Sequence, residues 1–201
     1  MNKYILILIV ILFSIFVNNT TSAVVVKISK KYPDNFIKMM NNILLFEGGY
    51  FAEEVTNFGV MQPIYDDYRK KKKLPQQDVN DITITEVYDI YYNMYYLKGK
   101  CNLLTPATSF VHFDACINFG IGGATKLLKK TIGLDYNTPY WNDSILIFIT
   151  DSVDIDLAYN YINNRMIKRY EIVKDHPKKK KFLKGWISRD DQVSSLITKY
   201  Y

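Results

Sequence analysis

Apolar residues recur at intervals of three and four along most of this sequence, and glycine or proline separates one such stretch from the next. The clearest stretch follows Pro33-Asp34 and contains Phe36, Met39, Met40, Ile43 and Leu44. This spacing places apolar side chains on one face of a helix, and the glycine pair Gly48-Gly49 is typical of a helix end. The pattern therefore predicts a mostly α-helical protein.

The same reasoning divides the rest of the chain into helical segments. We expect helices from Pro63 to near Lys73, over 87–97 behind a capping box of Thr83 and Glu86, from Pro106 to about Asn118, over 124–132, over 155–173 and over 182–197. The apolar run 145–149 fits either a buried helix or a strand. The chain is 48% hydrophobic and 201 residues long, enough for one well-packed domain.

The first 23 residues have the order of a signal peptide. A short positive start, Met1-Asn2-Lys3, precedes an apolar run from Tyr4 to Val17 and small residues at Ser22-Ala23. The apolar run is shorter than the roughly 20 residues of a membrane span, although an uncleaved N-terminal anchor stays open. We therefore expect an exported protein, periplasmic or secreted, whose leader contacts the membrane before cleavage.

The net charge of +6 favours anionic partners. The basic runs 69–73 and 178–181 are typical of solvated helix faces or loops, and no nucleic-acid motif accompanies them. We therefore expect no nucleic-acid partner. For an exported chain, the anionic polymer of a cell wall is the most economical partner.

The sequence contains two cysteines, Cys101 and Cys116. In an exported protein they can pair as a disulfide, but two free buried thiols fit the spacing equally well. Neither cysteine has the spacing of a metal ligand or a catalytic residue. Because His112 and His176 are lone histidines, we expect no metal site and no cofactor.

Glu47 is the most informative acidic residue. It follows Ile43 by four positions and so continues the apolar face of its helix, in the last turn, where the helix dipole is negative. Both influences favour the protonated acid, which is what cleavage of a glycosidic bond requires. Periodicity alone also allows Glu47 to turn outward into water at a frayed helix end.

Five segments of the chain resemble, in order, the motifs of the glycoside hydrolase family 108 muramidases, which are lysozyme-like enzymes of phages and bacteria. These segments are Phe46–Tyr50 (FEGGY), Thr56–Val60 (TNFGV), His112–Gly120 (HFDACINFG), Arg165–Tyr170 and Phe182–Arg189, which contains Gly-Trp-x-x-Arg. One short motif is weak evidence, but several in order are strong. By this resemblance Glu47 is the catalytic acid.

The resemblance also implies an architecture and a substrate. It predicts a lysozyme-like single domain with a cleft, a catalytic region over 34–135, and a C-terminal helical region over 136–201 that is packed in the same globular unit and can bind peptidoglycan. The substrate implied is the glycan strand of peptidoglycan, cut between N-acetylmuramic acid and N-acetylglucosamine. We expect a monomer.

The loop after Tyr50 departs from the family pattern because only 51–55 stands where the family has a longer segment. Glu53 or Glu54 can supply a second carboxylate, as base or as stabiliser of positive charge, and both fit solvated loop acids equally well. Tyr50, Thr56 and Asn57 are candidate substrate-binding residues. For Asn57 the alternative is a turn in which it tolerates an unusual φ while Gly59 supplies flexibility.

Asp114 and Asn118 lie one helical turn apart and are further candidates for substrate binding. A role in tying helices together is favoured for this pair, because buried polar groups need partners.

Two other functions stay open. A lytic transglycosylase uses the same acid with the sugar's own hydroxyl in place of water. A non-catalytic peptidoglycan-binding protein keeps the fold without turnover, and the shortened loop favours it.

Overall fold

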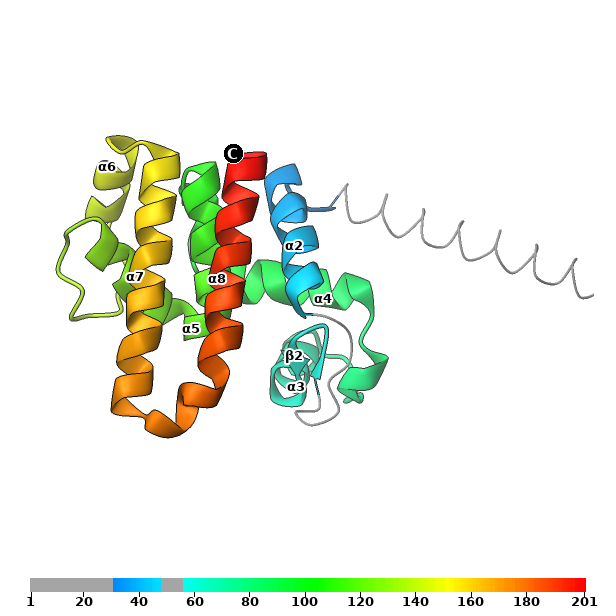
Figure 1. Ribbon diagram of the computed structural model, residues 1–201. Coiled ribbons are helices and arrows are strands. Elements are labelled where there is room, and N and C mark those ends of the chain that lie inside the picture. The colour runs from blue at the N-terminus through cyan, green and yellow to red at the C-terminus, as the bar shows by residue number, and fades with distance from the viewer. Residues whose placement is uncertain (1–30, 48–55) are drawn as a thin grey trace, which may run out of the picture. The chain divides into compact units, whose positions relative to one another are not determined.

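The computed structural model describes residues 31–47 and 56–201, and these are mostly α-helical, as the periodicity predicted (Figure 1). The chain forms two compact units, one extending to Asp89 and the other from Ile90 to Tyr201. The expected leader, 1–23, lies outside the described residues. Across the described ranges, no helix is long and apolar enough to cross a membrane.

The first unit contains short helices and one small hairpin. Its elements are α2 (Asp34–Glu47), β1 (Thr56–Asn57), β2 (Val60–Met61), α3 (Gln62–Lys71), the 3-10 turn η1 (Val79–Asp81) and most of α4 (Ile84–Tyr91). The capping box before α4 is confirmed: the Thr83 amide donates to Glu86 Oε2 at 3.0 Å, and the Glu86 amide donates to Thr83 Oγ1 at 3.3 Å. Its reciprocal bonds fix where α4 begins.

The core of the first unit forms around the apolar face of α2. Phe36, Met39, Met40 and Ile43 have no exposed surface, which confirms the predicted face. Tyr88 of α4 meets Phe36 edge-on, with ring centroids 6.1 Å apart. This geometry suits the aromatic quadrupoles and fixes α4 against α2.

The hairpin of β1 and β2 was not predicted. Asn57 pairs with Val60 and Thr56 with Met61, so two residues make the turn. Those two, Phe58 and Gly59, have φ of 52° and 73°. Two successive positive φ values define a type I′ turn, which matches the twist of paired strands. A turn here was one alternative, but Phe58 and Gly59 adopt the unusual φ, and Asn57 does not.

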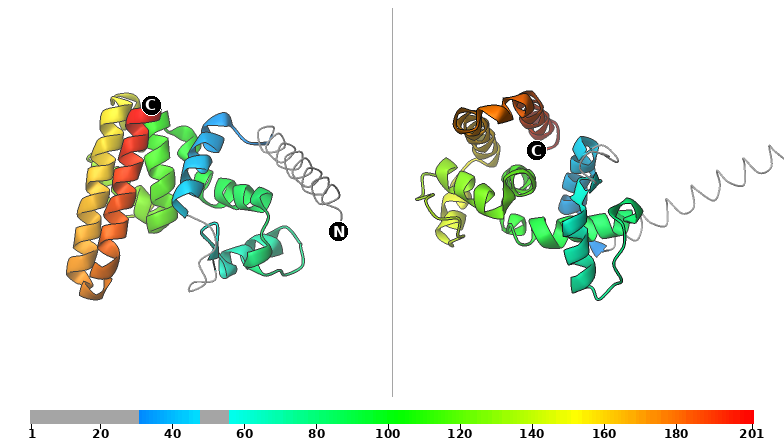
Figure 2. Two further views of the ribbon diagram at one scale, coloured as in Figure 1. Left: turned by 45° about the vertical axis from the view of Figure 1, so that its right-hand side comes forward. Right: turned by 90° about the horizontal axis from the view of Figure 1, so that it is seen from below.

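The second unit is dominated by three long helices. Its elements are the π-helix η2 (Tyr92–Tyr96), η3 (Cys101–Leu103), α5 (Pro106–Thr131), α6 (Ser144–Thr150), α7 (Asp154–Asp175), η4 (Pro177–Lys179) and α8 (Lys180–Tyr200). The helices α7 and α8 form an antiparallel hairpin, and α5 packs against α7 (Figures 1 and 2). The interior between these helices holds the polar network described below.

The helix α5 is broken at Gly120, as the sequence predicted. Gly120 has φ 70° and ψ 160°, a conformation that is essentially restricted to glycine. The chain continues as helix on both sides of this residue, so α5 consists of two segments.

The start of α5 is capped from α7 rather than by its own sequence. The Asp154 carboxylate accepts hydrogen bonds from the amides of Ala107 and Thr108, both at 2.8 Å, and from Thr105 Oγ1 at 2.6 Å. A carboxylate at a helix N-terminus satisfies free amides and opposes the positive end of the dipole. This contact ties the first turns of α5 and α7 together.

The structure decides between the two alternatives for one segment and corrects the expectation for another. The ambiguous run 145–149 is helical: Ile145 and Ile149 are buried, while Ile147 is 64% exposed. In the first basic run, Arg69 is only 8% exposed instead of solvated, because its guanidinium is paired inside the first unit.

Candidate functional site

The predicted catalytic acid, Glu47, is the last residue of α2. Ile43, one helical turn earlier, is fully buried. The side chain of Glu47 lies outside what the structure describes, as do Tyr50, Glu53 and Glu54. The helix end therefore lies where the acid was expected, and the roles of these four residues stay predictions.

The segment that follows the loop is anchored by Asn57. Its Nδ2 donates to the backbone oxygen of Asn80 in η1 at 3.1 Å, which holds the hairpin against that turn. Thr56 pairs in β1, and its side chain is outside the described part of the chain. The substrate-binding roles of Thr56 and Asn57 stay predictions.

A charged pair that sequence reasoning missed stabilises the interior of the first unit. Arg69 Nη1 contacts Glu86 Oε1 at 2.8 Å, and the Tyr65 hydroxyl donates to Glu86 Oε2 at 3.0 Å. Burial raises the pKa of Tyr65, so its hydroxyl stays protonated and donates to the carboxylate. The capping-box glutamate therefore also joins α3 to α4.

Asp89, at the end of the first unit, accepts contacts from two lysines and two tyrosines. Lys31 and Lys72 reach its two oxygens at 2.7 and 2.8 Å, and hydroxyls of Tyr32 and Tyr68 donate at 3.0 and 3.1 Å. Burial alone would raise the pKa of Asp89, but the hydrogen bonds from Lys31, Lys72 and Tyr32 hold it well below its usual range. Asp89 is thus a carboxylate fixed in its ionised form, unsuited to donate a proton.

Asp114 lies at the centre of a buried ion network in the second unit. It has no exposed surface, and its Oδ2 meets Arg165 Nη2 at 2.6 Å. Its Oδ1 accepts from Nε and Nη2 of Arg189 at 2.9 and 2.8 Å. Burial alone would raise the pKa of Asp114, but the two guanidiniums hold it below its usual range.

Asn118 completes the environment of Asp114. Its Nδ2 donates to the backbone oxygen of Asp114 at 2.8 Å and approaches Oδ2 at 3.3 Å. Through Arg165 and Arg189, Asp114 joins α5 to α7 and α8, whereas Asn118 bonds within α5, to Asp114. Their substrate-binding role stays a prediction.

The network extends to charged residues that the sequence did not single out as partners. Asp190 of α8 bridges Arg165 and Arg169 of α7, at 2.5 and 2.6 Å. The Arg169 guanidinium also lies over the Phe119 ring, 4.8 Å from its centroid. The motifs around Asp114, Arg165 and Arg189 thus meet in one place.

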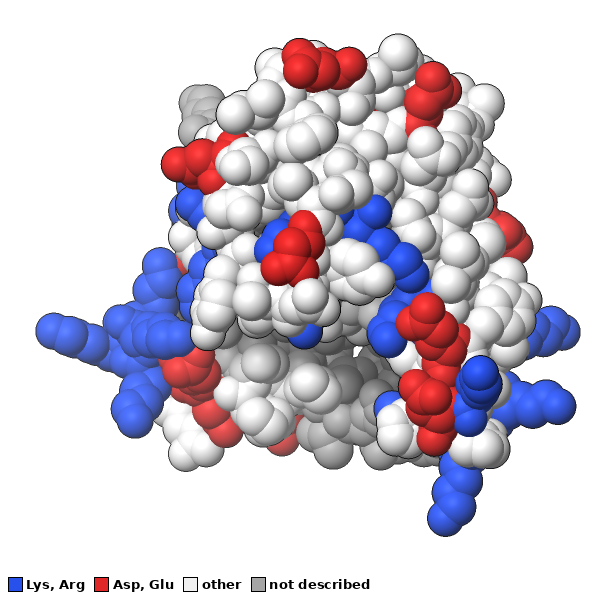
Figure 3. Space-filling model, turned by 90° about the vertical axis from the view of Figure 1, so that its left-hand side faces the viewer, with Lys and Arg blue, Asp and Glu red and all other residues white. Residues whose placement is uncertain are grey.

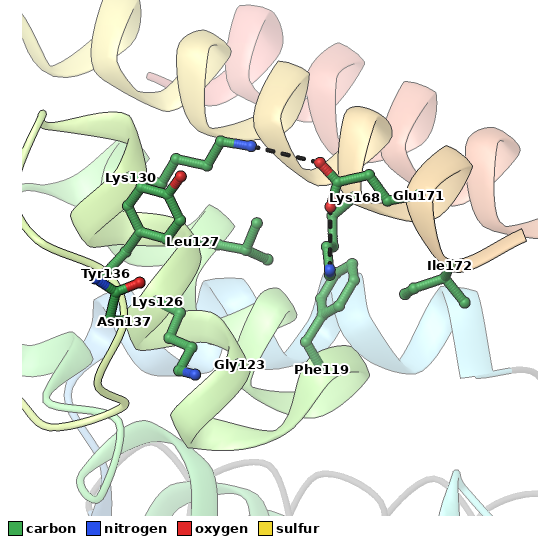
Figure 4. A pocket seen from close by; sticks show the side chains of 10 residues that line it. All are labelled: Phe119, Gly123, Lys126, Leu127, Lys130, Tyr136, Asn137, Lys168, Glu171 and Ile172. Carbon is green, nitrogen blue, oxygen red and sulfur yellow. Dashed lines mark hydrogen bonds and ion pairs between the residues drawn. The ribbon is translucent and has the colours of Figure 1, made fainter. Parts of the chain in front are cut away.

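A pocket of about 560 Å³ opens between the second segment of α5, the loop after it, and α7 (Figure 4). Its apolar lining includes Phe119 and Leu127, and Tyr136 lies beside them on the loop. Sugar rings and short peptides bind to surfaces of this kind when polar groups fix their orientation.

Charged residues at this pocket are mostly basic. Glu171 is paired with Lys168 at 3.0 Å and with Lys130 at 3.7 Å. Lys126 also lines the pocket and forms no salt bridge with any residue that the structure describes. Figure 3 shows basic side chains on the face that bears α6 and α7. Three ammonium groups against one carboxylate favour an anionic ligand.

One group of potential metal ligands occurs within residues 31–47 and 56–201. Atoms of Cys101, His112 and Cys116 lie within 4.8 Å of one another, and all three residues are buried. The expectation that His112 is a lone histidine was therefore wrong. The four-residue spacing from His112 to Cys116 was visible in the sequence, but Cys101 joins them from a separate turn.

Comparison with known proteins gives a family match over part of the chain and a similar fold. Residues 40–120 match the model of the family described as glycosyl hydrolase 108. The solved structure of Brucella abortus SagA has a TM-score of 0.69 to this chain at 24% identity, covering 82% of this chain and 94% of that one. No curated protein matches. The matched region includes Glu47 and the motif around Asp114, which confirms the resemblance.

Proposed function

Because the chain carries a glycosyl hydrolase family 108 domain, we propose that it is an exported N-acetylmuramidase that cuts peptidoglycan glycan strands, with Glu47 as the general acid. The single observation that carries this proposal is that the family match spans the end of α2, where Glu47 follows a fully buried face. The peptidoglycan substrate lies outside the cytoplasm, which agrees with a leader over 1–23.

The chemistry follows from the position of Glu47 at the C-terminal end of α2. The last turn of a helix carries partial negative charge, and an apolar surrounding disfavours a carboxylate, so both raise a carboxyl pKa. A protonated Glu47 donates its proton to the glycosidic oxygen as the bond to the muramic acid carbon breaks. The positive charge that develops on the sugar is then captured by water.

A second carboxylate in an enzyme of this kind either activates that water, in the inverting route, or attacks and stabilises the sugar carbon, in the retaining route. Glu53 and Glu54 are the candidates, because they follow Glu47 within the same loop. The separation of the two carboxyl groups sets the outcome: about 5–5.5 Å leads to retention and roughly 6.5–9.5 Å to inversion.

The pocket beside Lys126 contributes wall binding. Peptidoglycan carries carboxylates on its lactyl groups and stem peptides, which suit the ammonium groups around the pocket. Phe119 and Tyr136 offer rings against which apolar faces of sugars and peptides pack. The expected C-terminal binding segment, 136–201, then shares this role with the second segment of α5.

The decisive experiment compares wild-type protein with Glu47→Gln on purified wall sacculi. The glutamine keeps the shape and cannot donate a carboxyl proton, so we expect clearing to fall by at least a hundredfold while sacculus binding and the thermal midpoint stay unchanged. Glu53→Gln and Glu54→Gln test the second carboxylate, because the variant that removes it should also lose activity. Clearing by Glu47→Gln at the wild-type rate refutes the assignment.

Mass spectrometry of the products separates the proposal from its alternatives. Reducing N-acetylmuramic acid ends support hydrolysis. Anhydro-sugar ends identify a lytic transglycosylase that uses the same acid, and binding without any soluble product identifies a non-catalytic wall-binding protein.

A further inference from the structure

Two thiols meet in the interior of the second unit. Cys101 begins η3 and Cys116 lies in the first segment of α5, and neither has exposed surface. Their sulfur atoms lie within 4.8 Å of each other, and both are free thiols in this structure. A disulfide brings two sulfurs to about 2.05 Å, so the two side chains have to approach each other further to form the bond.

The backbone on either side of Cys101 is fixed to α5. Ser109 Oγ donates to the backbone oxygen of Cys101 at 2.7 Å, and His112 Nε2 lies 3.0 Å from the backbone oxygen of Gly99. Both contacts hold the 99–101 segment on the face of α5 that carries Cys116. The pairing of the two thiols is thus set by the surrounding structure.

Gly99 provides the space for the sulfur pair. A Cβ at this position would lie 2.6 Å from the Cys116 sulfur and 3.3 Å from the Cys101 sulfur. The backbone therefore passes directly over both sulfurs, which leaves them in contact with each other and closed off by the chain.

The hydrogen bonds of His112 make the cluster a poor metal site. The Tyr161 hydroxyl donates to the backbone oxygen of Ala124 at 2.7 Å and lies 2.9 Å from His112 Nδ1. A carbonyl oxygen only accepts, so the Nε2 that faces Gly99 is the donor of that contact. A histidine ligand needs a bare nitrogen, and both ring nitrogens of His112 already face hydrogen-bond partners in the surrounding protein.

From these contacts we propose that Cys101 and Cys116 are a modification site and form an intramolecular disulfide in the exported protein. The export on which this rests is part of the proposed function. The oxidant is a disulfide of the exporting compartment, carried by a small thiol or a thiol oxidoreductase.

The electron balance is that of two thiol–disulfide exchanges. One cysteine thiolate attacks the oxidant's disulfide, forms a mixed disulfide and releases one thiolate. The second cysteine thiolate attacks the first cysteine's sulfur, forms the Cys101–Cys116 bond and releases the other thiolate. The two cysteine protons pass to the released thiolates, so the protein loses two electrons and the oxidant gains them. Because both thiols are buried, these steps occur before the second unit closes.

The test uses the whole mature chain exported to a bacterial periplasm, unfolded without reductant and alkylated. We expect no free thiol, and after proteolysis one peptide pair joined through Cys101 and Cys116 with the mass of two hydrogens missing. Two alkylated cysteines in that material overturn the proposal. So does a stoichiometric zinc ion released on unfolding, because that outcome assigns the cluster to a metal.

A matched variant tests whether the bond exists in the folded state. We expect reductant to lower the thermal midpoint of the wild-type protein by roughly 6–12 °C, the shift for a loop of this length. The double variant Cys101→Ala, Cys116→Ala should be insensitive to reductant. An equal response of both proteins overturns the proposal. The thiol count does not depend on wall cleavage, so it also holds for Glu47→Gln and fails separately from the proposed function.

Discussion

Replacing Asp114 by asparagine should strongly destabilise the second unit. In the folded chain, Asp114 and Asp190 carry two negative charges against the three guanidiniums of Arg165, Arg169 and Arg189. Asp114→Asn keeps the shape but leaves three cations around one carboxylate, and it can turn an NH₂ donor toward guanidinium donors. Breaking a buried charge pair in this way costs about 3–5 kcal/mol.

The assay is urea and thermal unfolding followed by tryptophan fluorescence. Both tryptophans, Trp141 and Trp186, belong to the second unit, so the signal reports on the unit that contains Asp114. At about 2–4 °C per kcal/mol for a chain of this length, the midpoint should fall by roughly 6–20 °C. The control Asp191→Asn changes an exposed carboxylate on α8 and should shift stability by less than about 0.5 kcal/mol.

Low pH should destabilise the second unit by protonating the same carboxyl group, that of Asp114. The folded pKa of Asp114 is lowered, so its stabilisation is present above the unfolded value of about 3.9 and is lost as pH falls through the folded pKa. Wild-type stability should therefore decline at low pH more steeply than that of Asp114→Asn. A loss below about 1 kcal/mol on substitution, or identical acid limbs for the two proteins, would refute the reasoning.

Two further substitutions test other features of the second unit. Gly120→Ala should lower the free energy of unfolding in urea by about 1–3 kcal/mol, because the φ and ψ of this residue suit only glycine. Gly185→Ala, in α8 with open space around the added Cβ, should raise it by about 0.5–1 kcal/mol. Equal effects of the two substitutions would contradict this explanation. Lys126→Glu should weaken co-sedimentation with sacculi several-fold at low salt without changing the thermal midpoint. The control is Lys178→Glu, which changes an exposed lysine away from the pocket. Unchanged binding by Lys126→Glu, or the same loss of binding in both variants, would exclude the pocket from wall binding.

The helices were predictable because local signals agreed with tertiary packing. Pro63, Pro106 and the break at Gly120 each act within one or two residues, so the sequence locates them. The hairpin was missed because strands of two residues leave no alternation to detect, and its turn places Phe58 in a conformation unusual for a side chain of that size.

The partners of the charged residues could not be predicted in the same way. Asp114 and Arg165 are 51 positions apart, and the sequence contains no signal that says which cation meets which carboxylate. Arg69 was expected in solvent for the same reason, because its neighbours are lysines and its partner Glu86 belongs to another helix. The family motifs marked several of these residues without revealing that they meet.

The prediction of the catalytic residues rests on the helix end and on the family match. The end of α2 at Glu47 agrees with the expected helix bounds, and the family match includes this residue. The roles of Tyr50, Glu53 and Glu54 stay predictions that the variants above test.

The position of Arg189 near the end of the chain has a consequence for biosynthesis. Asp114 leaves the ribosome long before Arg189, and a carboxylate cannot enter an apolar interior at low cost until its cations arrive. The ion network around Asp114 is therefore complete only after α8 is translated. A nascent chain held open by the lack of this network is still unfolded, which is the state that the export proposed above would require.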